Sequence, residues 1–242
     1  MFKLIKSRWK KIADDLKGTP LYWQRTTSSI LFKKEFSRAI KKYVKGDVLD
    51  VGAGAMNYRS MIQSTGANYK SLDFGGTESK YDKNSKLDFV GDIQNLSFND
   101  ETYDTIFCSQ VLEHIPEPQK ALYEISRVLK KDGQALISVP HLAYLHNEPN
   151  DFYRYTKHGL SFMMEKANLN IIEIKSLGGF FSFIGYLSST FWLSIFYKIP
   201  IIWQIVFYIN LVVSYILIFL DKILMTHKIL PLNYLVVVKK EQ

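Results

Sequence analysis

The segment Val48-Leu49-Asp50-Val51-Gly52-Ala53-Gly54 constrains the fold of this chain more than any other feature. Its apolar part, 48–51, predicts a buried strand. Gly52 and Gly54 remove two Cβ atoms where the backbone must turn sharply and approach a ligand closely. We expect a helix to follow the turn, with the free amide groups of its first residues facing that ligand. Such a unit is typical of proteins that bind an adenosine-type cofactor.

Two further residues of the turn distinguish between candidate cofactors. A dinucleotide-binding turn carries a third glycine, and Asn57 occupies that position here. Asp50 lies two residues before Gly52, inside the end of the strand. An acid at this point would repel a pyrophosphate, whereas it suits the cationic amino group of S-adenosylmethionine. The turn therefore favours S-adenosylmethionine over a nicotinamide dinucleotide.

Three more predicted strands end in side chains that could complete such a site. The strand 67–72 ends at Asp73, whose carboxylate could accept both ribose hydroxyls, and the strand 87–90 leads to an acid and an apolar residue suited to adenine. The strand 103–108 leads to a serine. Ligands of open α/β sheets bind at the carboxyl ends of the strands. The predicted cofactor-binding residues are Asp50, Gly52, Gly54, Asp73, Phe74, Asp92, Ile93 and Ser109.

Four short motifs together resemble the class I S-adenosylmethionine-dependent methyltransferases: Asp50-Val51-Gly52-Ala53-Gly54, Leu72-Asp73, Gly91-Asp92-Ile93 and Leu112-Glu113-His114. The resemblance is greatest to the small-molecule group whose fourth strand leads into Val-Leu-Glu-His. It covers about residues 35–176 and resumes at 233–240. It implies an α/β, Rossmann-like sheet of seven strands with helices on both faces, and S-adenosylmethionine as cofactor. The Asn/Asp-Pro-Pro-Tyr box of enzymes that methylate base or glutamine nitrogens is missing after the fourth strand.

The remaining core elements follow from periodicity and from residues that begin or end helices. We predict a helix over 116–131, a strand over 134–139, and a helix that Thr156 caps and that runs to about residue 168. The last two strands are predicted over 171–176 and 234–238. The single cysteine excludes an internal disulfide and fits a cytosolic protein. The spacing of Cys and His residues indicates no zinc or iron site.

The segment after the fifth strand is the predicted acceptor region. Its sequence Asp-Phe-Tyr-Arg-Tyr-Thr at 151–156 resembles a box of methyltransferases associated with cell-envelope and glycan pathways. Arg154 could bind a phosphate or carboxylate of the acceptor, or it could pair with Asp151 at i, i+3 and brace the loop. The candidate substrate residues are Asp151, Tyr153, Arg154 and Tyr155, and the candidate general bases are His141 and His146.

Positive charge is concentrated at the N-terminus. The first 45 residues carry thirteen Lys or Arg and three acids, whereas the whole chain has a net charge of +8. Residues 2–16 predict a helix with an apolar side made of Phe2, Ile5, Trp9, Ile12 and Leu16. A basic amphipathic helix is typical of a membrane-surface segment, and no continuous apolar core follows that would make it a signal peptide. A nucleic-acid-binding arm and a solvated helix packed on the domain are the alternatives.

A long apolar insertion separates the last two predicted strands. Between residues 176 and 220 the only charged residue is Lys198. Because both flanking strands belong to one sheet, the insertion must cross a membrane either twice or not at all. Its two legs, 177–197 and 199–220, predict a crossing hairpin, a pair of helices in the membrane interface, or a buried contact between copies.

These observations divide the chain into a basic segment (1–34), a cofactor-binding core (35–176), a membrane-associated insertion (177–230) and a final strand (231–242). The resemblance and the insertion together imply a methyltransferase at the cytoplasmic face of a membrane, acting on a small-molecule, glycan or lipid-linked acceptor in cell-envelope biosynthesis. The alternatives are a non-catalytic cofactor-binding scaffold and an RNA methyltransferase. Nucleic acid is the less favoured partner because of the apolar insertion and the missing nitrogen-methylation box.

Overall fold

The structure is a computed structural model that describes residues 2–74 and 86–241. The chain divides into two compact units. We call residues 37–175 and 233–242 the sheet unit, and residues 1–36 and 176–232 the helical unit. The basic N-terminal segment and the apolar insertion, which are far apart in sequence, therefore belong to the same unit.

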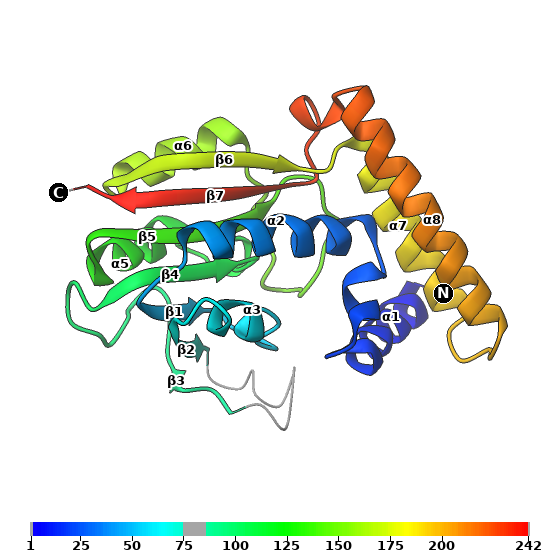
Figure 1. Cartoon of the computed structure of the whole chain (residues 1–242), viewed down its shortest axis with the longest axis horizontal. Helices are drawn as coiled ribbons and strands as arrows, with labels where there is room; N and C mark the ends of the chain where they lie inside the picture. Colours follow the sequence, from blue (N-terminus) through cyan, green and yellow to red (C-terminus); the bar gives the residue numbers. More distant parts are fainter. Residues whose placement is uncertain (1, 75–85, 242) are drawn as a thin grey trace. The chain divides into compact units, whose positions relative to one another are not determined.

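The sheet unit is built on a seven-stranded sheet of order β3-β2-β1-β4-β5-β7-β6. Strands β1 to β5 run parallel to one another, and β7 runs antiparallel to β5. Figure 1 shows helices in front of the sheet and behind it. The predicted α/β, Rossmann-like fold is thus confirmed. The strands are β1 (Asp47–Val51), β2 (Asn68–Asp73), β3 (Phe89–Val90), β4 (Tyr103–Ser109), β5 (Leu129–Pro140), β6 (Leu169–Leu177) and β7 (Asn233–Lys240).

The central strands are apolar on both faces because helices cover both faces. Val48, Leu49 and Val51 of β1 are fully buried, as are most residues of β4 and β5. Near-continuous apolar strands are typical of parallel sheets that are covered on both sides. The covering helices are α2 (Thr27–Tyr43), whose C-terminal part belongs to this unit, α3 (Arg59–Gln63), α5 (Pro118–Val128) and α6 (Lys157–Lys166).

Two predicted boundaries in the sheet unit are wrong. The helix predicted over 116–131 ends at Val128, and its last three residues begin β5 instead. Leu129 pairs with Tyr103 of β4, and a register shift separates this pair from the regular pairing that begins at Gln134. Pairing with a neighbouring strand therefore overrides the helical pattern. The third strand is only Phe89–Val90, at the edge of the sheet. The predicted cap is confirmed, since the Thr156 hydroxyl accepts a hydrogen bond from the Gly159 amide at 3.1 Å.

The helical unit contains α1 (Phe2–Leu16), η1 (Pro20–Gln24), α7 (Phe180–Ile195), α8 (Ile202–Ile223) and η3 (Thr226–Lys228). The predicted N-terminal helix is confirmed, although the side chains of Phe2 and Lys3 lie outside the described part. Ile12 and Leu16 of α1 pack with Leu193 of α7 and Phe207 of α8 in one apolar cluster. The Arg8 guanidinium donates to the carbonyls of Ser194 and Ile195, the last residue of α7. The N-terminal helix is therefore attached where α7 ends and α8 begins.

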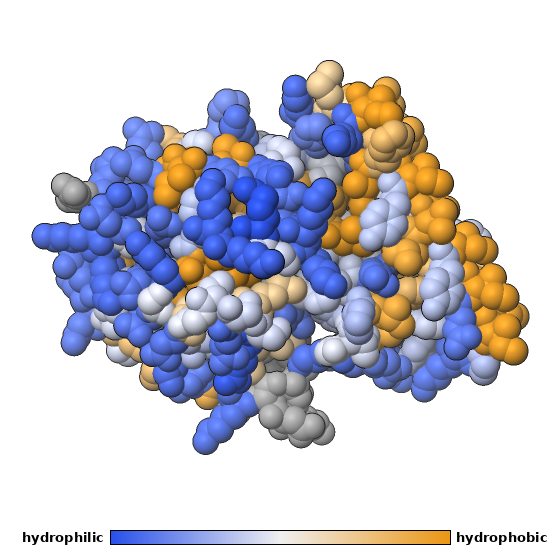
Figure 2. Space-filling view, in the orientation of Figure 1, coloured by the Kyte–Doolittle hydropathy of each residue, from blue (hydrophilic) through white to orange (hydrophobic). Residues whose placement is uncertain are grey.

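Most buried residues of α7 and α8 are small or polar, while many large apolar side chains are exposed; Leu193 and Phe207, in the cluster with α1, are the large apolar residues that are buried. The buried residues include Ser182, Gly185, Ser189, Ser194 and Ser214. Figure 2 shows a continuous apolar surface over this part of the molecule. Large apolar side chains are exposed along the whole length of α8: Ile202, Ile205, Tyr208, Ile209, Val212, Val213, Tyr215, Ile216, Phe219 and Ile223.

A buried carboxylate holds the base of the hairpin. Asp221 of α8 is 3 % exposed and accepts hydrogen bonds from the backbone amides of Gly179, Phe181 and Ser182 at 2.8–3.0 Å. It thereby satisfies the free amides at the start of α7. Within the described residues, α8 is the one helix that is long and apolar enough to cross a membrane, and α7 is shorter, at 16 residues.

Candidate active site

The candidate site lies where the carboxyl ends of the parallel strands meet. In the order β3-β2-β1-β4-β5, the connections leave in opposite directions from β1 and β4, so these two neighbours form the switch point of the sheet. Ligands of doubly wound sheets bind in the crevice outside this point. Gly52 follows β1, and Ser109 ends β4. The strands thus bring together the residues predicted from their separate positions in sequence.

The glycine turn after β1 has the two properties that its sequence predicts. Gly52 and Gly54 have φ values of +70° and +50°, in the region that favours glycine. A Cβ on Gly52 would lie 2.4 Å from the Val111 side chain, so the loop after β4 packs directly on this residue. Among the described residues, a Cβ on Gly54 would meet nothing closer than 3.9 Å. The space in front of Gly54 is therefore open to a ligand.

The amides of this turn do not behave as predicted. The Gly52 and Ala53 amides both donate to the Leu72 carbonyl of β2, at 2.8 and 3.0 Å. The next helix, α3, is only five residues long and begins at Arg59. The expectation that the first amides of that helix face the ligand is therefore wrong, because further turns separate the glycines from the helix.

Asp73 lies at the end of β2 and connects this strand to the glycine turn. Its Oδ2 accepts a hydrogen bond from the Gly54 amide at 2.6 Å, and its Oδ1 accepts one from the Phe74 amide at 2.7 Å. The side chain is 9 % exposed. The geometry is compatible with the predicted contact to a ribose.

Asp50 is buried at the end of β1 and already has a partner. Its Oδ2 accepts a hydrogen bond from the Tyr69 hydroxyl at 2.7 Å. Burial raises the pKa of Asp50 to about 7, partly offset by this hydrogen bond, and the nearby Asp73 charge raises it further. A cation near Asp50 would favour its ionised form. The predicted role toward the cationic part of the cofactor is consistent with this position and stays a prediction.

The other predicted cofactor residues differ in their exposure and in their hydrogen-bond partners. Asp92 follows β3, and its carboxylate accepts from the backbone and side-chain amides of Gln94. Ile93 is 4 % exposed and belongs to the main core, so the structure does not present it as a cover for a ring. Phe74 is 65 % exposed. The Ser109 hydroxyl shares a hydrogen bond with the Ser138 hydroxyl of β5 at 3.1 Å.

The predicted acceptor segment lies over the ends of β4 and β5. The Glu113 carbonyl accepts from the Phe152 and Tyr153 amides, and the Pro140 carbonyl accepts from the Tyr155 amide. The Tyr155 hydroxyl donates to the Leu112 carbonyl at 2.8 Å, and this residue is only 5 % exposed. Tyr155 is thus part of the core, and its predicted place in the wall of a substrate site is wrong.

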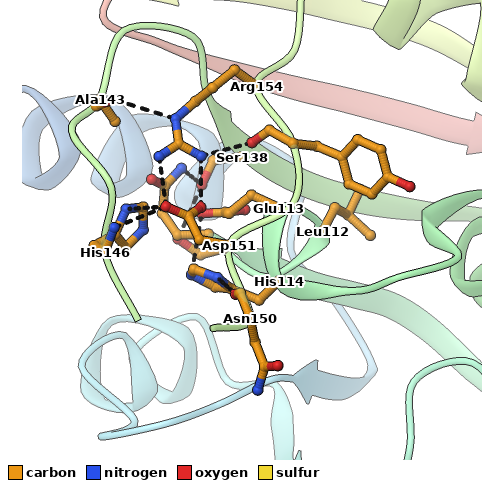
Figure 3. A network of polar contacts seen from close by, with 12 residues as sticks. Leu112, Glu113, His114, Ser138, Ala143, His146, Asn150, Asp151 and Arg154 are labelled. Atoms are coloured by element: carbon orange, nitrogen blue, oxygen red, sulfur yellow. Dashed lines mark hydrogen bonds and ion pairs between the residues drawn. The ribbon is translucent and has the colours of Figure 1, made fainter. Parts of the chain in front are cut away.

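Arg154 and Asp151 form a bidentate ion pair inside this segment (Figure 3). The two terminal nitrogens of the guanidinium lie 2.7 and 2.9 Å from the two carboxylate oxygens. Its remaining N–H groups donate to the carbonyls of Ala143, Tyr144 and Tyr153. The Arg154 hydrogen bond is the main reason why the pKa of Asp151 falls to about 2. This geometry favours the bracing role over the binding of an acceptor anion.

The two candidate bases occupy different surroundings. The His141 Nδ1 lies 2.8 Å from the Tyr155 carbonyl, and its ring packs against Tyr234. The His146 Nδ1 lies 3.1 Å from the Tyr144 carbonyl and 3.6 Å from Asp151 Oδ2. Tyr153, 40 % exposed, donates its hydroxyl to the Pro116 carbonyl at 2.9 Å. Catalysis by either histidine stays a prediction.

A cluster that sequence reasoning missed lies beside this segment. Glu113, His114 and His146 each bring one potential ligand atom within 4.8 Å of the other two. Burial raises the pKa of Glu113 to about 8 and lowers the pKa of His114. Glu113 and His114 are adjacent, but His146 is supplied by the following loop. Because His146 is distant in sequence from Glu113 and His114, the sequence indicated only the adjacent pair and not the cluster.

The residues of this edge fit S-adenosylmethionine on structural grounds. The open space at Gly54 allows the backbone to approach the cofactor, and a Cβ there would intrude on it. Asp73, which is predicted to bind the ribose, ends β2 beside this space, and the buried acid Asp50 lies on the neighbouring strand, next to the turn. These three features are those that an adenosyl group with a cationic tail requires.

Comparison with known proteins agrees with this site. Residues 49–137 match the family described as "Methyltransferase domain". The ubiquinone biosynthesis O-methyltransferase of Klebsiella pneumoniae is 28 % identical over 99 residues, which are 38 % of this chain and 41 % of that protein. The demethylmenaquinone methyltransferase of Clavibacter sepedonicus is 27 % identical over 113 residues, 44 % of this chain and 46 % of that protein. The chain thus spans less than half the length of these curated relatives.

Solved structures show the same fold. Phosphoethanolamine N-methyltransferase 2 of Haemonchus contortus, in complex with S-adenosylmethionine, superposes with a TM-score of 0.55 at 16 % identity. The match covers 95 % of this chain and 60 % of that one. Taken with the strand order and the glycine turn, these findings show that the chain has the fold of class I S-adenosylmethionine-dependent methyltransferases and matches the methyltransferase domain over residues 49–137.

Proposed function

We propose that this protein is a methyltransferase that works at the cytoplasmic face of a membrane. It transfers the methyl group of S-adenosylmethionine to a small-molecule, glycan or lipid-linked acceptor in cell-envelope biosynthesis. The observation that carries the membrane part is the inverted packing of α7 and α8. Apart from Leu193 and Phe207, which pack with α1, the buried residues of these helices are small or polar, and large apolar side chains are exposed.

Such packing is expected where the surroundings are apolar. In lipid, burial of large apolar side chains between helices gives no hydrophobic gain, so close contacts are made by small residues and interhelical hydrogen bonds. Here the Ser189 hydroxyl donates to the Asn210 side-chain oxygen at 2.7 Å, between α7 and α8. In water the exposed apolar face of α8 would be a large unfavourable surface. The packing therefore supports contact of this face with lipid.

The position of α1 favours helices that lie in the interface over a crossing hairpin. As a helix, α7 with 16 residues is about 24 Å long, less than the roughly 30 Å of a bilayer core. The basic helix α1 is attached where α7 ends and α8 begins, through Arg8 and the cluster around Leu193 and Phe207. A crossing hairpin would carry α1 and its charges through the membrane. Interfacial helices require no such transfer, and a basic face favours anionic lipid.

The connection of the insertion to the sheet supports an acceptor held at the membrane. Asn233, the first residue of β7, pairs with Pro140, the last residue of β5. Because β5 is parallel to β4, β7 begins at the edge where the glycine turn and the acceptor segment lie. The insertion is therefore tethered at the edge of the sheet that carries the site. The quinone pathways in the names of the relatives are compatible with an apolar acceptor.

The proposed reaction is a direct displacement, in which the acceptor atom forms a bond to the methyl carbon while the bond from carbon to sulfur breaks. S-adenosylmethionine supplies a methyl group on a positively charged sulfur, so the leaving group is already activated. The protein then contributes mainly position and the exclusion of water. The glycine turn and Asp73 would hold the adenosyl part, and the acceptor segment would cover the site. His141 or His146 could remove a proton from an oxygen acceptor.

Membrane binding can be tested with flotation on vesicles that contain anionic lipid, using Phe219→Asp on the exposed face of α8. The matched control is Phe162→Asp on α6 of the sheet unit, since the two residues are 60 % and 57 % exposed. We expect Phe219→Asp to reduce flotation and Phe162→Asp to leave it unchanged. All four tryptophans lie in the helical unit, so a blue shift of their fluorescence should accompany binding. Wild-type protein that stays unbound would refute the membrane assignment.

Methyl transfer can be tested by incubating the protein with radiolabelled S-adenosylmethionine and a membrane extract. Lipid, glycan, protein and RNA fractions are then separated. We expect label in the lipid or glycan fraction, and less of it with Asp73→Ala at a limiting cofactor concentration. Cofactor binding without label in any fraction would favour a non-catalytic scaffold, and label confined to RNA would favour the third candidate function.

A further inference from the structure

Two histidines and one glutamate lie together between the end of β4 and the acceptor segment. Glu113 and His114 belong to the short helix η2 (Leu112–His114), and His146 belongs to the loop after β5. The His114 Nε2 lies 3.9 Å from Glu113 Oε1, and one ligand atom of each of the three residues lies within 4.8 Å of the other two. The two imidazole rings are 4.8 Å apart between centroids, at an angle of 82°.

The other nitrogen of each imidazole is already engaged. The His114 Nδ1 lies 2.6 Å from the Asn150 carbonyl oxygen. The His146 Nδ1 lies 3.1 Å from the Tyr144 carbonyl oxygen and 3.6 Å from Asp151 Oδ2. Metal-binding histidines typically direct their second nitrogen to a carbonyl or carboxylate in this way, which fixes the tautomer. Since Nδ1 is engaged in both residues, Nε2 is the nitrogen left for a ligand.

The glutamate provides an independent indication of a missing partner. Its side chain is fully buried, and both carboxylate oxygens lack a hydrogen-bond donor among the described residues. A buried carboxylate in this state is costly unless a cation or a donor compensates it. The nearby Arg154 guanidinium is already paired with Asp151 through two hydrogen bonds. These two charges cancel, so the cluster retains an uncompensated negative charge whenever Glu113 is ionised.

We propose that Glu113, His114 and His146 form a binding site for a divalent transition-metal ion, with Asp151 orienting His146 from behind. Two imidazoles and one carboxylate suit Zn²⁺, Fe²⁺ or Mn²⁺, rather than Ca²⁺ or Mg²⁺, which prefer oxygen ligands. Three ligand atoms held about 2.1 Å from one ion, in trigonal or tetrahedral positions, lie about 3.5 Å from one another. The described spacing, up to 4.8 Å, must therefore shorten by about 1 Å when the ion binds.

Three protein ligands leave at least one coordination position open. In catalytic zinc sites with this number of ligands, that position holds water or substrate. The cluster lies beside the acceptor segment, so an oxygen atom of the acceptor could occupy the open position. This last step rests on the proposed methyl transfer. The binding of the metal ion does not, because it requires neither cofactor nor acceptor.

Metal binding can be measured on the full chain, prepared without a polyhistidine tag and stripped with a chelator. Calorimetry with Zn²⁺ and visible absorption with Co²⁺ give the stoichiometry and the coordination. We expect one equivalent to bind, with a Co²⁺ spectrum of low coordination number. Glu113→Gln and His146→Ala should abolish this stoichiometric binding. Asp151→Asn, which acts through His146, should weaken it by about 10–100-fold.

Two controls separate loss of the site from loss of the fold. His158→Ala removes an exposed histidine of α6 and should leave binding unchanged. Binding of S-adenosylhomocysteine reports whether each variant retains its domain. A wild-type protein that binds no metal, or Glu113→Gln and His146→Ala variants that bind it as the wild type does, would overturn the proposal. Metal binding without methyl transfer to any acceptor would uphold the site and count against the proposed function alone.

Discussion

Substitution of Gly52 by alanine tests the central role assigned to the glycine turn. Two separate costs follow from the structure. An L-residue at a φ of +70° costs about 1–2 kcal/mol. The new Cβ would also lie 2.4 Å from the Val111 side chain, and overpacking of this kind typically costs about 1–3 kcal/mol. We therefore expect Gly52→Ala to lower the free energy of unfolding of the sheet unit by about 2–5 kcal/mol.

Gly54→Ala is the matched control, because it shares the first cost and lacks the second. Its φ is +50°, and its Cβ would meet no atom of the described residues closer than 3.9 Å. We expect a loss of only about 1–2 kcal/mol in stability. Its effect should fall mainly on the cofactor, since the Cβ would occupy the open space described above. Gly52→Ala should thus act on stability and Gly54→Ala on the binding of S-adenosylhomocysteine.

Hydrogen exchange of the β1 and β4 amides is the suitable assay for stability, because core amides report the global unfolding free energy of their unit. Tryptophan fluorescence cannot serve, since every tryptophan lies in the helical unit. The double variant Gly52→Ala/Val111→Ala should recover about 1–3 kcal/mol relative to the sum of the single variants. Equal losses for Gly52→Ala and Gly54→Ala, or no coupling to Val111, would refute the reasoning.

Three further perturbations follow from the described contacts. Asp73→Ala should weaken the binding of S-adenosylhomocysteine by about 1–3 kcal/mol in calorimetry, and Asp73→Asn, which keeps an acceptor for the Gly54 amide, by less. The folded-state pKa of Asp50, raised to about 7, means that the folded chain binds one proton more than the unfolded chain between about pH 4 and 7. The contribution of this group to stability should therefore fall as the pH rises through that range, and Asp50→Asn should remove this slope from the exchange data. Asp221→Ala should leave the first amides of α7 without an acceptor and shift unfolding of the helical unit, followed by fluorescence, to lower urea, while Asp221→Asn should do so less.

The sheet could be predicted because its signals are local. An apolar run followed by glycine marked β1, and an acid marked the end of β2. The start of β5 could not be found in this way. Residues 129–131 continue a helical pattern, and only their pairing with β4 draws Leu129 into the sheet. The glycine turn was located correctly, but the delayed start of α3 depends on turns between the glycines and Arg59 that follow no clear motif.

The candidate site could also be predicted only in part. The positions of residues directly after a strand could be predicted, because the end of the strand fixes where they lie. The position of His146 could not be found, since it depends on the Asp151–Arg154 pair and on backbone hydrogen bonds that fold the loop back toward Glu113. The inverted packing of the helical unit was likewise hidden. Hydropathy along the chain shows that 176–220 is apolar, but not which side chains face each other.

The ends of the insertion lie side by side. The Leu232 amide donates to the Gly178 carbonyl at 3.3 Å, so the chain leaves β6 and enters β7 at almost the same point. A short hairpin loop could close this gap without changing the strand order. Replacement of residues 179–231 by such a loop would therefore remove α7 and α8 and keep the connection between β6 and β7. The shortened chain would test the proposed membrane contact directly, because the sheet that carries the candidate site stays complete.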